Sequence, residues 1–192
     1  MYEVFYQIIK LLLKPLFNIF YVVRVEGLDN LPEENGYIVC GNHARVIDPI
    51  LLGVNMPKKI YFMAKNELFK NKLVAFVLKG LGAFPVKRGE ADLKSIKTSL
   101  KLLQTQQNIG IFPEGTRNTT GELKAEPGIA MLAIKSKRPI VPVAIKTDYK
   151  IFHRTDIVIG KAINLSEHFD TKLKNEDYKD ISLEIMKKIK KL

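Results

Sequence analysis

A histidine and an aspartate five positions apart, His43 and Asp48, stand in a polar stretch that follows an apolar run. That run, GYIVC at 36–40, is short, rich in β-branched and aromatic residues and closed by a glycine, which predicts a buried strand ending in a loop. An imidazole on such a loop can take a proton from a hydroxyl near neutral pH. We therefore predict that His43 is a general base and that Asp48 orients its ring.

The same pair also has a plainer interpretation. Asp48 precedes Pro49 and the apolar run 50–52, a pattern typical of a helix that begins with Asp as the N-cap and Pro as the first helical residue. His43 would then be an ordinary loop histidine. One His/Asp pair is a weak signal, so the rest of the chain has to decide between the two interpretations.

Two arginines lie shortly after predicted strands. Arg88 ends LGAFPVKR at 81–88, and Arg117 ends IFPEGTR at 111–117. The planar guanidinium offers paired donors and keeps its charge, which suits a phosphate monoester. We predict that Arg88 and Arg117 converge on one anion; each taken alone could equally be a surface charge.

In chain order, four blocks resemble those of the glycerolipid acyltransferases, the family typified by 1-acylglycerol-3-phosphate acyltransferase. The resemblance covers about 22–163, and two residues after the histidine the chain has Arg45 where the family usually has serine. The blocks are NHxxxxD, matched by Asn42, His43 and Asp48; a glycine followed by an arginine, matched by Gly82 and Arg88; FPEGTR, matched letter for letter by 112–117; and a proline-centred apolar strand, matched by Pro142 in IVPVAI.

The resemblance implies a reaction and a set of site residues. The reaction is transfer of a fatty acyl group from a thioester, acyl-CoA or acyl carrier protein, to the sn-2 hydroxyl of 1-acylglycerol-3-phosphate (lysophosphatidate), giving phosphatidate without a further cofactor or a metal. Another lysophospholipid or glycerol-3-phosphate is the alternative acceptor. The predicted catalytic residues are His43, Asp48 and Lys65, and the predicted substrate-binding residues are Asn42, Lys87, Arg88, Glu114, Gly115, Thr116 and Arg117.

Lys65 enters this set because it ends a predicted strand and lies in AKNEL, which is similar to an AKxEL stretch of the family. A lysine there could stabilise the oxyanion that develops on an attacked carbonyl. The alternative is an ordinary solvated lysine.

Length, charge and residue composition limit the number of domains and the kinds of partner that the chain can have. With 192 residues and 46% hydrophobic content, the chain fits one domain with a sizeable core. Its net charge of +11 favours anionic partners, namely phosphate-bearing lipid, an anionic membrane surface or acyl carrier protein. Without tryptophan or a zinc-like Cys/His cluster, nucleic acid is a poor candidate. A single cysteine excludes an internal disulfide, and His153 and His168 lie in unrelated contexts that suggest no metal site.

The first 21 residues are predicted to form a membrane-associating helix, with the catalytic domain at 22–192. The segment is strongly apolar, and its polar residues form one narrow stripe, which favours a helix lying in the bilayer interface over a spanning one. We expect a kink near Pro15 and a peripheral or monotopic location on the cytoplasmic side of the membrane. A helix packed on the domain and a signal peptide are the alternatives. The stripe consists of Glu3, Gln7, Lys10, Lys14 and Asn18.

Beyond this helix, strand-like and helix-like segments alternate. This alternation predicts an α/β fold, a mixed, largely parallel sheet flanked by helices. A basic amphipathic helix at the C-terminus could cover the core or touch anionic lipid. The predicted strands lie at 22–26, 36–40, 59–64, 83–86, 108–112, 140–145 and 157–159, and the predicted helices begin at 49 and span 73–81, 93–103, 128–137 and 181–192.

Two rival functions remain open from the residues. Cys40 could be a thiol nucleophile, although strand alternation favours a buried core thiol. The chain could also be a peripheral lipid-binding protein without catalysis, which would explain its charge and its amphipathic ends. That second rival gives no reason for His43, Asp48 and the 114–117 stretch to occur together.

Overall fold

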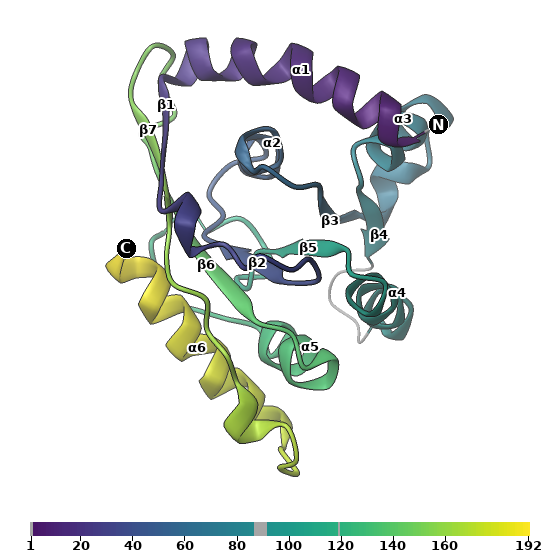
Figure 1. The fold of residues 1–192 in the computed structure, drawn as a ribbon, viewed down its shortest axis with the longest axis vertical. Coiled ribbons are helices and arrows are strands. Elements are labelled where there is room, and N and C mark those ends of the chain that lie inside the picture. Colours follow the sequence, from purple (N-terminus) through teal and green to yellow (C-terminus); the bar gives the residue numbers. More distant parts are fainter. Residues whose placement is uncertain (1, 87–91, 119) are drawn as a thin grey trace.

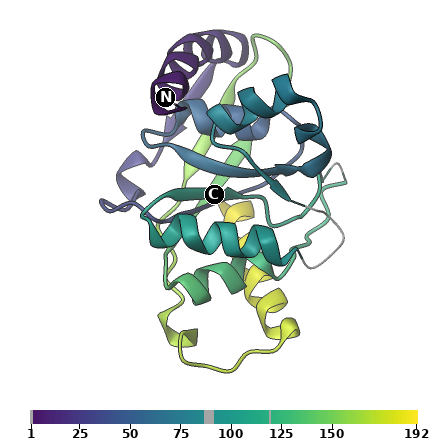
Figure 2. The same ribbon diagram turned by 90° about the vertical axis from the view of Figure 1, so that its right-hand side faces the viewer.

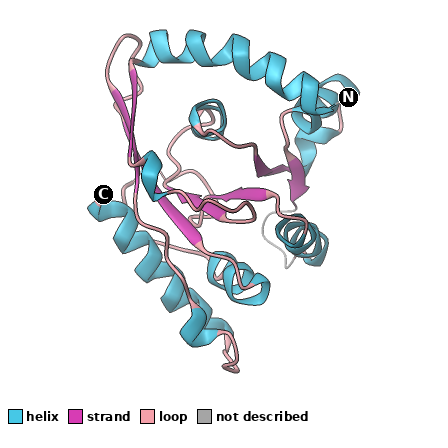
Figure 3. Cartoon of the chain, in the orientation of Figure 1, coloured by secondary structure: helices cyan, strands magenta, loops and turns pink. Residues whose placement is uncertain are grey.

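The computed structural model describes residues 2–86, 92–118 and 120–192, and it confirms the predicted alternation of strands and helices (Figure 3). The strands are β1 (Val23–Glu26), β2 (Ile38–Gly41), β3 (Ile60–Lys65), β4 (Phe84–Val86), β5 (Asn108–Ile111), β6 (Ile140–Lys146) and β7 (Thr155–Ile159). The α-helices are α1 (Tyr2–Tyr21), α2 (Asp48–Asn55), α3 (Lys72–Gly80), α4 (Leu93–Gln104), α5 (Gly128–Ser136) and α6 (Asn175–Lys191).

The strands form one sheet in the order β1-β7-β6-β2-β5-β3-β4. The five strands from β6 to β4 are mutually parallel, β7 runs antiparallel to β6, and β1 is parallel to β7. The sheet is therefore mixed and largely parallel, as predicted. Because parallel strands end at the same edge, the segments that follow β6, β2, β5, β3 and β4 all emerge there, where open α/β sheets bind their ligands.

Helices cover both faces of the sheet (Figures 1 and 2). On one face α4, α5 and α6 pack over a core cluster that includes Ile38, Cys40 and Ile109, while the other face carries α2 over a cluster that includes Val39 and Phe62. The central strands β2 and β5 are buried at every position, as expected for apolar strands covered on both sides. These rigid strands fix where the following loops begin.

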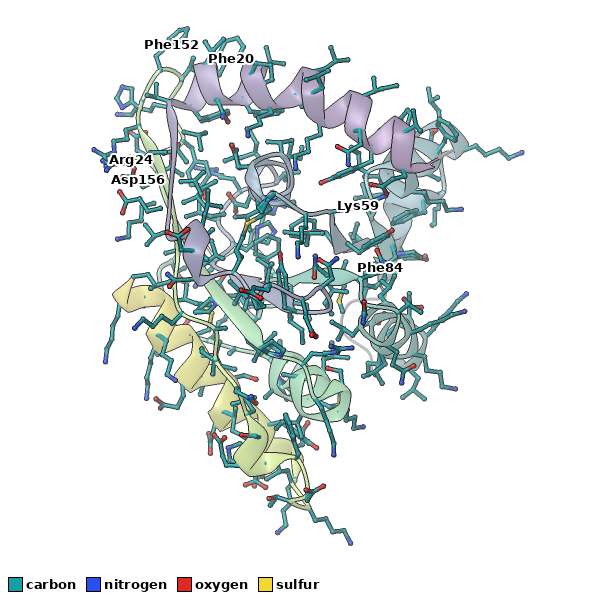
Figure 4. The ribbon with its side chains drawn as sticks, in the orientation of Figure 1. Phe20, Arg24, Lys59, Phe84, Phe152 and Asp156 are labelled. Atoms are coloured by element: carbon teal, nitrogen blue, oxygen red, sulfur yellow. The ribbon has the colours of Figure 1, made fainter. Side chains whose placement is uncertain are left out.

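Helix α1 lies over α2, on the far side of α2 from the sheet (Figure 1). The buried Tyr6 hydroxyl donates to the Gly53 carbonyl (3.2 Å), and Lys10 of the polar stripe donates to the Met56 carbonyl at the end of α2. Glu3 forms an ion pair with Lys59 (3.3 Å; Lys59 is labelled in Figure 4). Glu3, Tyr6 and Lys10 therefore attach the helix to the domain, whereas Gln7 and Lys14 of the stripe are exposed. Pro15 lies within a helix that continues from Tyr2 to Tyr21.

The apolar side of α1 consequently faces outward, with only 6% of its most apolar window buried. Within the described ranges, this is the one helix, Glu3–Tyr21, whose length and composition would allow it to cross a membrane, and it lies near the N-terminus, where signal sequences have the same character. The large apolar side chains of α1 that are exposed are Val4, Ile8, Leu11, Leu12, Leu16, Ile19 and Phe20.

Candidate active site

His43 and Asp48 meet in the loop between β2 and α2. The Nδ1 atom of His43 lies 2.9 Å from Oδ2 of Asp48, and the two residues are 8% and 0% exposed. A carboxylate accepts a hydrogen bond, so Nδ1 carries the proton and Nε2 keeps its lone pair in the neutral ring. The pair therefore has the geometry of a general base with its orienting acid.

The Asp48 carboxylate also holds the loop itself. Its Oδ2 atom accepts the backbone amides of Ala44 and Arg45, both at 2.8 Å. Asp48 is not the helix N-cap that the sequence suggested: Ile47 caps α2 without a side-chain bond, and Ile47 carbonyl accepts the first-turn amides. The physical reason is that the Asp48 carboxylate already accepts hydrogen bonds from the His43 ring and from two amides that precede it in the chain, so it is not available to the amides of α2.

Arg45 takes part in this arrangement through its backbone amide, which any residue except proline supplies. Its side chain is exposed, and its guanidinium lies 5.7 Å from the centre of the Tyr149 ring. The His/Asp pair therefore forms with arginine at a position where the family usually has serine.

Aromatic rings fix the plane of the imidazole. The His43 ring stacks on Phe112 (centroids 4.3 Å apart, planes at 22°), and Phe112 stacks on Phe62 (5.9 Å, 15°). A Cβ atom at Gly110 would overlap the Phe62 ring, so glycine is needed there for the stack to form. The stack lies on the α2 face of the sheet.

The loop after β5 is hydrogen-bonded to both the backbone amide and the backbone carbonyl of His43. Glu114 Oε2 accepts the His43 amide (2.7 Å), Glu114 Oε1 accepts the Asn118 side-chain amide (3.0 Å), and the Asn118 backbone amide donates to the His43 carbonyl (2.7 Å). Burial raises the pKa of Glu114, and the hydrogen bonds from His43 and Asn118 act in the opposite direction. Glu114 thus holds the backbone of His43, the predicted general base, in place.

Three other predicted substrate-binding residues lie on this same loop. Gly115 has φ of +69°, a conformation that glycine adopts without strain. Thr116 is exposed and its hydroxyl lies 3.4 Å from the Lys124 amine. Arg117 is exposed, and within the described part of the chain its side chain has no recorded hydrogen bond or ion pair. The structure therefore brings Arg117 beside the His43 loop with its guanidinium open to a ligand.

Lys87 and Arg88 lie outside the described residues, so their predicted meeting with Arg117 remains a prediction. Asn42 is described: its side-chain amide donates to the Ile145 carbonyl (3.0 Å) and accepts the Ile145 amide (2.7 Å). Both bonds tie the end of β2 to β6. A substrate contact from Asn42 also remains a prediction.

Lys65 ends β3, as predicted, and its amine lies 3.8 Å from Glu67. Alternate residues of a strand face opposite sides of a sheet. Lys65 is in phase with Tyr61 and Met63, which pack toward α4 and α5, and out of phase with Phe62 beneath the imidazole stack. No contact among the described residues supports its oxyanion role, which stays a prediction.

Cys40 lies in the core on the α4–α6 face of the sheet, with no exposed surface. Burial raises the pKa of its thiol, which keeps the sulfur protonated and unreactive. This placement favours the core thiol over the thiol nucleophile.

Sequence reasoning missed one member of the site. The Tyr149 hydroxyl, in the connection between β6 and β7, donates to Asp48 Oδ1 (2.8 Å). Burial raises the pKa of Tyr149, and the neighbouring Asp48 charge raises it further, so the group stays a donor. Tyr149 lies 101 residues beyond Asp48 and outside the four matched blocks, so no local pattern could have found it.

Comparison with known proteins identifies the family of the chain. The model of the Acyltransferase family matches residues 22–146, which includes the His43 loop, the Glu114 loop and β6. The chain belongs to the Acyltransferase family. In this family member, His43, Asp48 and the 114–117 loop lie within the matched region, whereas Tyr149 lies three residues beyond it.

Individual relatives carry more specific names. The chain is 42% identical over 123 residues to a 1-acyl-sn-glycerol-3-phosphate acyltransferase of Bacillus subtilis, an alignment that covers 64% of this chain and 61% of the relative. It is 30% identical over 135 residues to the human 1-acyl-sn-glycerol-3-phosphate acyltransferase alpha, covering 68% of this chain and 47% of the relative. This acyltransferase-family chain thus matches less than two thirds of the length of these relatives.

A solved structure shares the fold. The crystal structure of the 1-acyl-sn-glycerophosphate acyltransferase PlsC from Thermotoga maritima superposes with a TM-score of 0.70 at 23% identity, covering 96% of this chain and 79% of that one. The similarity extends over α1 as well as the sheet, because nearly the whole acyltransferase-family chain is covered.

Proposed function

We propose that the protein transfers a fatty acyl group from a thioester to the sn-2 hydroxyl of 1-acylglycerol-3-phosphate, giving phosphatidate for phospholipid synthesis. The observation that carries the proposal is the buried bond from His43 Nδ1 to Asp48 Oδ2, in a chain that belongs to the Acyltransferase family. Several relatives are named for this reaction, which supports the choice of acceptor.

The chemistry follows from the free ring nitrogen. His43 Nε2 takes the proton of the acceptor hydroxyl while the hydroxyl oxygen attacks the thioester carbonyl carbon. The carbon–sulfur bond of the tetrahedral intermediate then breaks, and the imidazolium returns the proton to the thiolate. Asp48 holds the tautomer and stabilises the imidazolium, as in other His/Asp pairs. The acceptor alcohol is itself the nucleophile, so no acyl-enzyme is required.

Phosphate binding would place the acceptor against the base. Arg117, whose guanidinium has no partner among the described residues, is next to Asn118, whose amide is bonded to the His43 carbonyl. A phosphate held by Arg117, together with the predicted Arg88 and Lys87, would therefore sit at a fixed separation from His43. Holding two reactants in this way converts a bimolecular step into an effectively unimolecular one.

The outward apolar side of α1 suits a protein that meets its lipid substrate at an anionic membrane surface on the cytoplasmic side. Glu3, Tyr6 and Lys10 bond to the domain, so the helix can lie on the bilayer with the catalytic domain attached directly beneath it. Either acyl-CoA or acyl carrier protein can serve as the donor, since both carry anionic groups toward a chain of net charge +11.

Mass spectrometry of products tests the proposal. Purified protein is incubated in anionic vesicles with lysophosphatidate, lysophosphatidylcholine or glycerol-3-phosphate, and with acyl-CoA or acyl carrier protein as donor. We expect phosphatidate from lysophosphatidate, formed at least about a hundredfold more slowly by His43→Ala protein purified in the same way. A different acylated product would reassign the acceptor. Vesicle binding without any product would instead favour a non-catalytic lipid-binding protein.

A further inference from the structure

The connection between β6 and β7 joins the catalytic carboxylate to the surface of the protein. At its inner side, Tyr149 is half-buried and donates its hydroxyl to Asp48 Oδ1. Of the two carboxylate oxygens, Oδ2 already serves His43, Ala44 and Arg45. The Tyr149 hydroxyl donates to the other oxygen, Oδ1, so both oxygens of the carboxylate are hydrogen-bonded.

Two residues farther along, the same connection carries large apolar side chains into solvent. Ile151 is 56% exposed and Phe152 is 67% exposed. The Phe152 ring lies 5.8 Å from that of Phe20 at the end of α1, and the Phe152 amide donates to the Phe20 carbonyl (2.6 Å). Figure 4 shows Phe20 and Phe152 together at this corner of the molecule. The exposed apolar row of α1 therefore continues onto the segment 149–152, which we term the tip.

The backbone of the tip depends on these contacts. Tyr149 and Phe152 have φ of +61° and +65°, left-handed conformations that are unfavourable for bulky residues and persist where surrounding contacts impose them. One such contact lies inward at Asp48, and the other lies outward at α1. A displacement of Phe152 would therefore be transmitted to Tyr149 across only two intervening residues.

We propose that the tip is a lipid-contacting segment whose seating in the membrane beside α1 positions Asp48 through Tyr149. Ile151 and Phe152 enter the interface, and Tyr149 acts as a positioning residue because it touches the carboxylate and not the substrate. The proposed partner is the lipid surface itself, since the tip is continuous with the outward apolar side of α1. The inference rests on the proposed acyltransferase function for its kinetic part only.

Fluorescence tests the lipid contact without any activity measurement. The natural chain has no tryptophan, so Phe152→Trp introduces a single reporter. On vesicles of phosphatidylglycerol and phosphatidylcholine we expect a blue shift of its emission and quenching by brominated lipid. Leu93→Trp is the matched control, because Leu93 is equally exposed at 66% but lies on α4, away from α1. Equal responses from the two reporters, or none from Phe152→Trp in vesicle-bound protein, would overturn the proposal.

Kinetics tests the link to the carboxylate. The readout is the ratio of kcat on vesicles to kcat on a dispersed short-chain lysophosphatidate. We expect Tyr149→Phe to lower kcat on vesicles about tenfold with KM unchanged, since it removes one hydrogen bond to a buried charge. Both Tyr149→Phe and Phe152→Ser should lower the ratio of kcat on vesicles to kcat on dispersed substrate. The double variant should have a ratio no lower than that of Tyr149→Phe alone.

The controls for this cycle are Tyr178→Phe on α6 and Leu93→Ser on α4, with unfolding midpoints measured for every variant. A loss in the double variant equal to the product of the two single losses would refute the link. A rise in KM without loss of kcat in Tyr149→Phe would refute the positioning role. If wild-type protein forms no phosphatidate, the proposed function fails while the fluorescence result still decides whether the tip meets lipid.

Discussion

The described chain contains two histidine–aspartate pairs with the same sequence spacing and nearly the same bond. His43 and Asp48 are joined at 2.9 Å, and His153 and Asp148 are joined at 2.8 Å, in each case through Nδ1 and Oδ2. Their surroundings differ sharply. The side chains of the first pair are 9% and 0% exposed, whereas those of the second are 53% and 44% exposed.

The two carboxylates also differ in what else they hold. Asp48 accepts two loop amides and the Tyr149 hydroxyl in addition to the ring, so its position is fixed from several directions. Asp148 accepts the Lys150 amide, which is the main reason that its pKa is lowered, and solvent screens the rest. The bond length is therefore common to both pairs, and what sets His43 and Asp48 apart is burial and an immobilised acid.

The largest expected effect separates the two histidines. His43→Ala should lower the transfer rate by about 10²–10⁴-fold, because it removes the general base. His153→Ala removes an exposed ring that bonds to Asp148 and not to Asp48, and it should leave the rate within about twofold. Both rates are measured as kcat with lysophosphatidate and an acyl thioester.

Circular dichroism and vesicle sedimentation would show that both histidine variants fold and bind lipid. A comparable loss of rate in the two variants would remove the distinction drawn between the pairs. Undiminished turnover in His43→Ala would refute its role as the base.

The second comparison concerns the acids. Asp48→Asn places an amide nitrogen among groups that need acceptors, so we expect a rate loss of about a hundredfold and about 1–3 kcal/mol less free energy of unfolding. Asp148→Asn keeps an acceptor oxygen for the Lys150 amide and should leave the urea midpoint unchanged. Equal shifts of the two urea midpoints would show that burial of Asp48 does not set it apart.

The smallest expected effect concerns Glu114, which clamps the His43 amide. Its pKa is raised above the ordinary 4.5 chiefly by burial. The stability that it contributes is therefore fully present below that ordinary value and is lost as the pH rises through the raised value. Relative to Glu114→Gln, the wild-type unfolding free energy should decline with pH from 4.5 upward.

Urea titrations of both proteins between pH 4 and pH 7 measure that difference, and Glu122→Gln on the same loop is the control. A wild-type stability that rises relative to Glu114→Gln over this range would contradict the assigned sign. It would mean that hydrogen bonds to the carboxylate outweigh its burial.

Local patterns were enough to predict most of the fold. Apolar runs such as 108–112 and 140–145 fall on buried strands because a strand covered on both faces needs apolar residues at nearly every position. Periodic runs such as 93–103 fall on helices for the corresponding reason. The order of the strands could not be predicted, since it depends on pairings between residues far apart in the chain.

The sequence by itself determined the elements, the His43–Asp48 pair and the membership of a family, because these depend on residue types at short spacing. Only the tertiary structure decided that Asp48 faces back toward His43, that Glu114 holds a backbone amide, and that Lys10 of α1 bonds to the domain. It also brought Tyr149 to Asp48 across 101 residues. The physical reason is that burial and hydrogen-bond partners are set by which strands end side by side, and spacing along the chain does not encode that.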